Sequence, residues 1–229
     1  MTEPSAKVRR SNRTRLRVLW IVTGGIFIWS AIRPHDYFTW ILEVFPAIIG
    51  AVVLAATYRR FRFTQLVYTL IALHMIILMV GGHYTYAEVP IGNWIRDYFE
   101  LTRNHYDRVG HFAQGFVPAM IAREVLLRLN VMRSGGWLSV FVVSLCLAFS
   151  ALYELLEWTV SALTGSAGDA FLGTQGDVFD TQKDMGMALV GAITALLLLS
   201  KLHDRQLERI RLRFRKRTSR SLDRSGVPH

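Results

Sequence analysis

Apolar and polar residues alternate along this chain in long blocks. Six apolar stretches are separated by polar connections, and each is close to the ~20 residues that a helix needs to cross a bilayer core. Because backbone groups inside lipid must be hydrogen-bonded within the segment, such stretches have to be helices. The pattern predicts an all-α, polytopic membrane protein. The predicted spans are 16–32, 39–57, 64–80, 109–129, 137–160 and 183–202.

The spans divide the chain into three regions. We expect a basic arm over 1–15, a six-helix membrane domain over 16–202 and a basic tail over 203–229. The first span is long for the apolar part of a signal peptide and no Ala-x-Ala follows it, so we interpret it as a retained helix. The tail is predicted to extend the last helix beyond Lys201. It is expected to become disordered near 217–229, where charge and Ser, Gly and Pro accumulate.

The connection between the third and fourth spans contains a shorter pattern. Apolar residues recur at helical spacing from Ile91 to Phe99, and Pro90 stands where a helix can begin. The pattern predicts an amphipathic helix at the outer membrane interface, with Trp and Tyr at headgroup depth. The alternative is that the apolar stripe packs on the bundle as a lid. In both cases this helix would cover the acidic site described below.

Charge gives the predicted orientation. Of the 27 Lys and Arg residues, 22 fall in the two tails, in the two connections on the same predicted side and in the span ends that adjoin them, and the net charge is +10. Positive charge concentrates on the cytoplasmic side of membrane proteins, so both termini are expected in the cytoplasm and the protein in the bacterial inner membrane. The same distribution argues against a nucleic-acid partner. The single cysteine, Cys146, lies in an apolar stretch and permits no internal disulfide.

Most acidic residues fall on the opposite, periplasmic side, and seven of them belong to three sets. The first opens the fourth span, where Asp107, His111 and Gln114 share one helical face. An aspartate four residues before a histidine can orient the imidazole and raise its basicity, which suits a general base or a metal ligand. The alternative is a helix start favoured by Asp107, with His111 and Gln114 as hydrogen-bonding groups between helices.

The second set lies at the end of the fifth span. Glu154 and Glu157 are three residues apart and can point into the same space. Two adjacent carboxylates repel each other unless a cation, a shared proton or an arginine intervenes. Glu154 lies deeper than Glu157, which could instead extend to water.

The third set precedes and opens the sixth span. Its aspartates are spaced three and four apart on one helical face, and hard oxygen ligands suit Mg²⁺, Ca²⁺ or Mn²⁺. Gly173 and Gly176 would allow a tight turn before them. The alternative is a carboxylate network neutralised by Arg103, Arg108 and Lys183. The candidates of this set are Asp177, Asp180 and Asp184, with Asp169 and Gln175 as additional candidates.

The three sets come from different helices but share one predicted depth, so they could meet in one pocket. In that arrangement Glu154 and the three aspartates of the last set would hold a divalent cation. His111 would be the catalytic base and Asp107 its orienting partner. Glu157 and Gln114 are additional candidates.

These motifs are similar to those of a known family. The segments Asp107-Arg108-x-Gly110-His111-Phe112-x-Gln114-Gly115-Phe116, Glu154-x-x-Glu157-Trp158 and 171–185 together resemble the YjdF-type bacterial inner-membrane family. This resemblance covers about residues 15 to 200 and implies topology and compartment but no established reaction. A more distant similarity is to VanZ-like membrane proteins, through Asp107, His111 and Phe112. Arg108 stands where those proteins have lysine, and the arginine of their third motif has no clear match.

The leading functional hypothesis is an envelope protein that acts on a lipid-linked or amphiphilic molecule. If it is an enzyme, metal-assisted hydrolysis or group transfer is the natural reaction class. The alternatives are a proton- or ion-coupled transporter and a non-catalytic membrane scaffold. Apart from the lipid bilayer, the sequence names no partner and no oligomeric state. It contains no Gly-x-Ser-x-Gly, His-Glu-x-x-His or P-loop motif.

Overall fold

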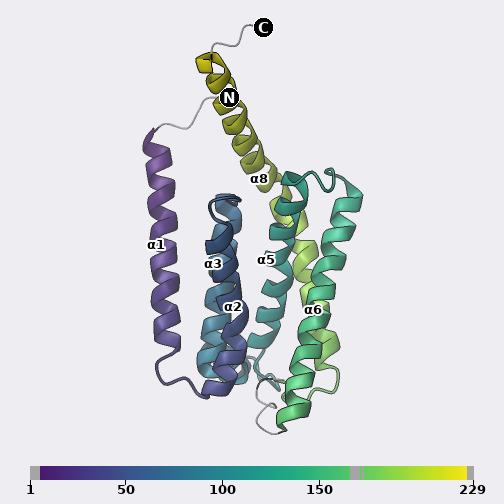
Figure 1. Ribbon diagram of the computed structural model, residues 1–229. Coiled ribbons are helices and arrows are strands. Elements are labelled where there is room, and N and C mark those ends of the chain that lie inside the picture. The colour runs from purple at the N-terminus through teal and green to yellow at the C-terminus, as the bar shows by residue number, and fades with distance from the viewer. Residues whose placement is uncertain (1–5, 166–170, 172, 226–229) are drawn as a thin grey trace.

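The computed structural model describes residues 6–165, 171 and 173–225, and over these ranges it is a bundle of helices without strands (Figure 1). The predicted all-α class is therefore confirmed. The described elements are α1 (Ala6–Ser30), α2 (Tyr37–Thr57), α3 (Gln65–Tyr84), the short 3-10 helix η1 (Tyr86–Glu88), α4 (Pro90–Tyr98), α5 (Tyr106–Arg128), α6 (Gly136–Thr164) and α8 (Asp180–Ser225).

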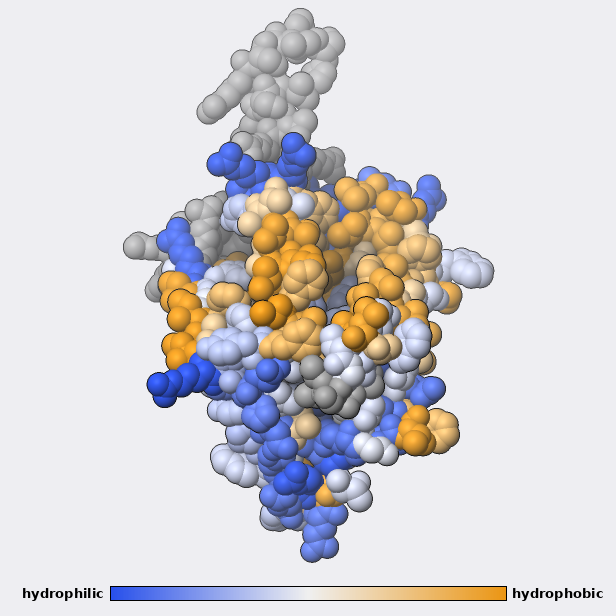
Figure 2. Space-filling model, turned by 60° about the horizontal axis from the view of Figure 1, so that its bottom comes forward, coloured by the Kyte–Doolittle hydropathy of each residue, from blue (hydrophilic) through white to orange (hydrophobic). Residues whose placement is uncertain are grey.

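Four helices are long and apolar enough, by length and composition, to cross a membrane. They are α2, α3, α6 and the Asp180–Leu212 part of α8. Helices α1 and α5 run alongside them in the bundle (Figure 1). On the face shown in Figure 2, a belt of apolar side chains separates two hydrophilic ends, as expected for a protein surrounded by lipid. Six spans remain a prediction.

The two ends of the bundle differ. The beginning of α1 and the end of α8 lie at the same end, together with the α2–α3 and α5–α6 connections (Figure 1). We call this the basic end, because the connections contain Arg59, Arg60, Arg62 and Arg133. The opposite end holds α4 and the connections that follow α1, α3 and α6. We call it the acidic end, because the three predicted acidic sets lie there.

The predicted disorder of the tail is wrong for part of its length. Helix α8 continues without a break through the predicted boundary at 202 and ends at Ser225, beyond the expected start of disorder near 217. Leu, Arg, Lys and Gln between 201 and 217 are good helix formers, and the Ser, Gly and Pro on which the prediction rested are concentrated in the last residues. Residues 226–229 lie outside the described ranges.

Helix α5 is the centre of the bundle, and its closest partner is α8. A Cβ atom added to Gly115 of α5 would lie 1.8 Å from the carbonyl oxygen of Ala188, and one added to Gly191 of α8 would lie 2.1 Å from that of Phe112. Only glycine allows the two backbones to approach so closely. This contact fixes the acidic residues at the start of α5 against those at the start of α8.

The amphipathic helix is present as α4, beginning at Pro90 as predicted. Its apolar stripe is exposed, with Trp94 at 72% and Tyr98 at 81% of full exposure, so it does not pack on the bundle as a lid. The opposite side carries Gly92, which is buried against Asn104. An outward apolar stripe is the arrangement expected for a helix in the membrane interface.

Candidate functional site

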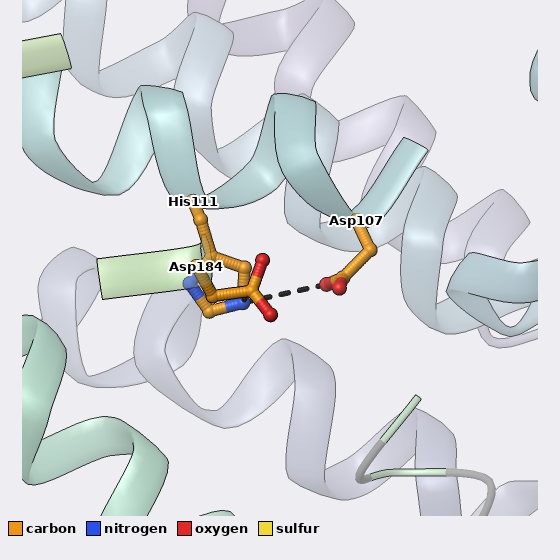
Figure 3. A group of neighbouring side chains, drawn as sticks. All are labelled: Asp107, His111 and Asp184. Carbon is orange, nitrogen blue, oxygen red and sulfur yellow. Dashed lines mark ion pairs between the residues drawn. The ribbon is translucent and has the colours of Figure 1, made fainter. Parts of the chain in front are cut away.

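His111 and Asp107 lie one turn apart at the start of α5, as their spacing predicted (Figure 3). The Nε2 atom of His111 is 3.4 Å from Oδ1 of Asp107 and 3.8 Å from Oδ1 of Asp184, which comes from the first turns of α8. All three side chains are buried. The predicted meeting of these groups from distant parts of the chain is found in the structure.

The other ring nitrogen of His111 faces α6. Its Nδ1 atom is 3.5 Å from Oε1 of Glu154, and both atoms are buried without a hydrogen-bond partner among the described groups. One oxygen of Glu157 lies within 4.8 Å of ligand atoms of His111 and Glu154. A second trio within the same limit consists of Asp107, His111 and Asp184. Buried polar atoms are nearly always paired, so unpaired ones indicate a missing water or ion.

A small cavity of about 70 Å³ adjoins these groups. It is large enough for a few water molecules. Helices α2, α3, α5 and α6 all contribute to its wall, and the Nε2 atom of His74 on α3 is buried there without a partner. The polar residues that line the cavity are Glu43, His74, Tyr86, Asp107, His111, Gln114, Tyr153 and Glu157.

The aspartates of the third set are paired with arginines. Nη1 of Arg103 donates to Oδ1 of Asp180 at 2.5 Å and lies 3.5 Å from Oδ2 of Asp177. Arg108 forms short ion pairs with both Asp180 and Asp184. Of the two possibilities left open by the sequence, the geometry therefore corresponds to a carboxylate network neutralised by basic side chains.

Lys183 completes this network at the surface. Its Nζ donates to Oδ2 of Asp177 at 2.6 Å, and the backbone N–H of Phe179 donates to Oδ1 of the same residue. The Lys183 ammonium, with a smaller contribution from the Phe179 N–H, holds the pKa of the Asp177 carboxyl below its ordinary value. At neutral pH the Asp177 carboxylate is thus ionised and paired with Lys183, which argues against it as a free metal ligand.

Gln175 positions a loop instead of contacting His111. Its side chain accepts from the backbone N–H of Asn104 at 3.0 Å and donates to the backbone carbonyl of Asn104 at 3.0 Å. Gly173 and Gly176 on either side have positive φ angles, as predicted for a tight turn. These two hydrogen bonds hold the connection between α6 and α8 against the segment before α5. Asp169 lies outside the described residues.

Sequence analysis did not select Glu43, which is buried in α2 and lines the cavity. The signal was available, because Glu43 is the one acidic residue within the second span and a carboxylate in a membrane helix is costly. Tyr86 was also missed. It follows α3, and a Cβ atom added to Gly81 or Gly110 would fall within 3 Å of its ring, so two glycines make room for it. No periodic pattern predicts that contact.

The acidic groups outnumber the basic groups in this part of the protein. In the described ranges, Glu43, Glu154 and Glu157 have no Lys or Arg within ion-pair distance. The ion pairs that the structure describes for Arg103, Arg108 and Lys183 are all with aspartates. Buried carboxylates without cations require protons or a bound ion, since an isolated buried charge is very costly. The carboxylates that meet here are Glu43, Asp107, Glu154, Glu157, Asp177, Asp180 and Asp184.

A second buried polar network lies towards the basic end. Glu124 of α5 is fully buried and accepts from the backbone N–H and hydroxyl of Thr64, from Arg128 at 2.8 Å and from His203 of α8. His203 in turn contacts Arg123 at 2.9 Å. Sequence analysis missed His203. Because each carboxylate oxygen of Glu124 has partners, this network fastens α3, α5 and α8 together.

Comparisons with known proteins agree with the helical, apolar architecture. The family model described as "Predicted membrane protein (DUF2238)" matches residues 15–205. The chain is 50% identical over 187 residues to the inner membrane protein YjdF of Escherichia coli (strain K12), covering 82% of this chain and 90% of that protein. No solved structure matches. The similarity to VanZ-like proteins remains a prediction. The resemblance to the YjdF-type family that the motifs indicated is therefore confirmed. From the extent of both matches, the chain belongs to the DUF2238 family of membrane proteins.

Proposed function

We propose that this membrane protein binds a divalent cation between α5 and α6, with Nδ1 of His111 and the carboxylates of Glu154 and Glu157 as ligands. One observation carries the proposal. The buried Nδ1 of His111 and Oε1 of Glu154 face each other at 3.5 Å, and neither has a hydrogen-bond partner in the described part of the chain. A cation would satisfy both atoms and reduce the repulsion between the two glutamates.

This ligand set differs from the one that the sequence suggested. Asp180 and Asp184 are already paired with Arg108, and Asp177 with Lys183. A divalent ion placed among them would have to displace these basic groups. Glu154 and Glu157 have no such competitor among the described residues, and they are the more favourable ligands for that reason.

The chemical type of the donor atoms limits which metal ions fit this site. Carboxylates alone suit Mg²⁺ and Ca²⁺, whereas an imidazole together with carboxylates favours Mn²⁺ or Zn²⁺. Asp107, 3.4 Å from Nε2 of His111, would act as the second partner that fixes the ring orientation and raises the basicity of Nδ1. The proposal therefore changes the predicted role of His111 from general base to ligand.

The predicted reaction class fits a cation at this place. A bound cation can polarise a phosphoryl or carbonyl oxygen, which supports hydrolysis or group transfer on a lipid-linked or amphiphilic envelope molecule. Glu154 also lines a second groove of about 440 Å³ between α6 and the start of α8, through which such a molecule could approach. The distribution of Lys and Arg predicts that this end faces the periplasm.

The test is metal analysis of the full chain purified in detergent and dialysed against trace Mn²⁺ and Zn²⁺. The wild type is expected to retain close to one ion per chain, and Glu154→Gln and Glu157→Gln are expected to lose it. Asp97→Asn is the matched control, because Asp97 is an exposed acid on α4 whose ion-pair partner among the described residues is Arg96. Retention of the ion by both Gln variants, or its absence from the wild type, would refute the proposal. Gel filtration shows whether each variant is folded.

A proton-coupled carrier is the second candidate. The unpaired Nε2 of His74 and the buried carboxyl of Glu43, both beside the cavity, favour it. Protons could neutralise these groups without any metal. However, the apolar residues Val117, Met120 and Cys146 separate the cavity from the Glu124 network in this conformation. Metal-free wild-type protein that acidifies the lumen of liposomes in a manner abolished by Glu43→Gln would favour the carrier.

A further inference from the structure

A groove of about 660 Å³ runs along the outside of the α5–α8 pair at the acidic end. Its walls are almost entirely apolar, and Val109 and Val190 are half exposed along it. The helices on which it lies form the tightest contact of the bundle, at Gly115 and Gly191. The groove is therefore a fixed feature of a rigid helix pair. The residues that line it are His105, Arg108, Val109, Phe112, Lys183, Gly186, Met187 and Val190.

Gly186 leaves part of this groove open, because it has no side chain. A Cβ atom added to this residue would meet no other atom within 4 Å, in contrast to Gly115 and Gly191. The glycine thus leaves space in the wall of the groove, not between the helix backbones. A side chain introduced at this position would occupy the groove without disturbing the helix contact.

The groove has one polar end, and that end is basic. It contains Lys183, which is largely exposed, together with Arg108 and His105. No acidic side chain lines the groove within the part of the chain that the structure describes. Burial, and then the charge of Arg103 and of Arg108, lower the pKa of the His105 imidazole below its ordinary value. His105 is therefore neutral at pH 7. Since Arg108 is paired with Asp180 and Asp184, the exposed charge at this end is that of Lys183.

We infer that this groove is a binding site for one anionic phospholipid, with an acyl chain along Phe112, Met187 and Val190 and the headgroup phosphate at Lys183. An apolar groove in a membrane protein is filled by a lipid tail, and the basic side chain at the polar end of this groove favours a negatively charged headgroup. The ammonium of Lys183 has three donors, of which Asp177 takes one, so donors remain for a phosphate.

The groove is connected to the candidate cation site. Arg108 lines the groove and pairs with Asp184, whose carboxylate lies 3.8 Å from Nε2 of His111. The inference deepens the proposed function, because it names a lipid class for the same end of the protein. Lipid binding itself does not need the cation, so the two proposals can fail separately.

Native mass spectrometry of the delipidated full chain tests the inference. The protein is titrated with phosphatidylglycerol and with phosphatidylcholine of identical acyl chains, with and without EDTA. We expect phosphatidylglycerol to bind about fivefold more tightly, which corresponds to one favourable basic contact near the membrane surface. The preference is expected to persist in EDTA. Equal binding of the two lipids, or loss of the preference in EDTA, would overturn the inference.

Two variants localise the site. Gly186→Leu fills the groove and is expected to reduce phosphatidylglycerol binding at least about fivefold, whereas Lys183→Gln is expected to remove most of the preference between the lipids. Lys201→Gln is the control for the loss of one lysine, because Lys201 is an exposed residue of the same helix towards the basic end. Wild-type binding by Gly186→Leu would show that the lipid lies elsewhere. The metal content of Gly186→Leu is expected to equal that of the wild type.

Discussion

His111 is the residue on which the proposed chemistry depends, because its two ring nitrogens face different neighbours. Nε2 lies near Asp107 and Asp184, which have arginine partners, and Nδ1 lies near Glu154. Neither Glu154 nor the neighbouring Glu157 has an arginine partner in the described part of the chain. The spacing of Asp107 and His111 predicted their contact. Whether arginines would neutralise the aspartates of the third set was left open by the sequence, because Arg103 and Arg108 reach residues 77 and 76 positions away along the chain.

Asp107→Asn is expected to weaken the affinity for Mn²⁺ by about 10- to 100-fold, because an amide orients the imidazole less firmly and does not raise its basicity. Isothermal titration of the metal-free protein measures this change. Asp97→Asn should bind as the wild type does. An Asp107→Asn protein with unchanged affinity would show that His111 is not oriented through Asp107.

The pair formed by Asp177 and Lys183 gives a pH prediction. The pKa of Asp177 lies below its ordinary value of 3.8 in the folded protein because of the Lys183 ammonium. Its stabilising contribution is therefore present above the ordinary value and is lost as the pH falls through the lowered pKa. Titration of ¹³C-labelled aspartate by NMR should show this low pKa. In Lys183→Gln the pKa of Asp177 should rise. An unchanged pKa would contradict the ion pair between Asp177 and Lys183.

At the scale of elements, α2, α3, α5 and α6 begin and end within a few residues of the predicted spans, because apolar length and turn residues are local properties. Helix α1 begins at Ala6 and α8 ends at Ser225, well outside the predicted bounds of 16 and 202. Helix α5 differs from the other helices of the bundle in its composition. It carries Asp107, Arg108, His111, Arg123 and Glu124, and its composition is less apolar than that of α2, α3 or α6. Its place at the centre of the bundle, surrounded by α3, α6 and α8, explains why it can hold so many polar groups.

Gly115→Ala and Gly191→Ala are each expected to destabilise the protein by about 1–3 kcal/mol, since the added methyl group would overlap a backbone carbonyl of the partner helix. Thermal unfolding in detergent, followed by circular dichroism, measures the change. Gly25→Ala on α1 is the control. Its Cβ would meet nothing within 4 Å, and it should be neutral or stabilise by about 0.5–1 kcal/mol. Equal effects at all three positions would disprove the close backbone contact.

At the scale of the whole molecule, two polar networks occupy opposite ends of the bundle with an apolar core between them. The network around His111 leaves Nδ1 of His111 and Oε1 of Glu154 without a hydrogen-bond partner among the described groups, whereas both carboxylate oxygens of Glu124 are paired. A network that leaves buried groups unpaired is suited to binding, and one that satisfies all its members is suited to holding helices together.

Glu124→Ala is therefore expected to cost about 3–5 kcal/mol, because it leaves His203 and Arg128 without their buried partner. Asp204→Ala removes a half-exposed carboxylate from the same network and should cost at most about 1 kcal/mol. Unfolding by SDS titration compares the two. Metal binding of folded Glu124→Ala should be unchanged, and a loss of the ion would show that the two ends are coupled.

The orientation in the membrane can be tested with fusions. Green fluorescent protein joined after residue 225 is expected to fluoresce, because the positive charge near the basic end predicts a cytoplasmic location. Alkaline phosphatase joined after residue 100, behind α4, is expected to be active in the periplasm. Active phosphatase at both positions would contradict six spans with both termini inside.

The sequence by itself determined the helical class, the family, the amphipathic helix α4 and the depth at which acidic residues gather. These follow from apolar length, periodicity and motif spacing, which are properties of neighbouring residues. Tertiary structure alone decided that arginines pair with the aspartates of the last set and that, among the described residues, Glu154 and Glu157 have no Lys or Arg partner. It also decided that Glu43 and His203 belong to buried networks. The physical reason is that electrostatic pairing depends on distance in space, and the approach of α5 to α8 sets those distances.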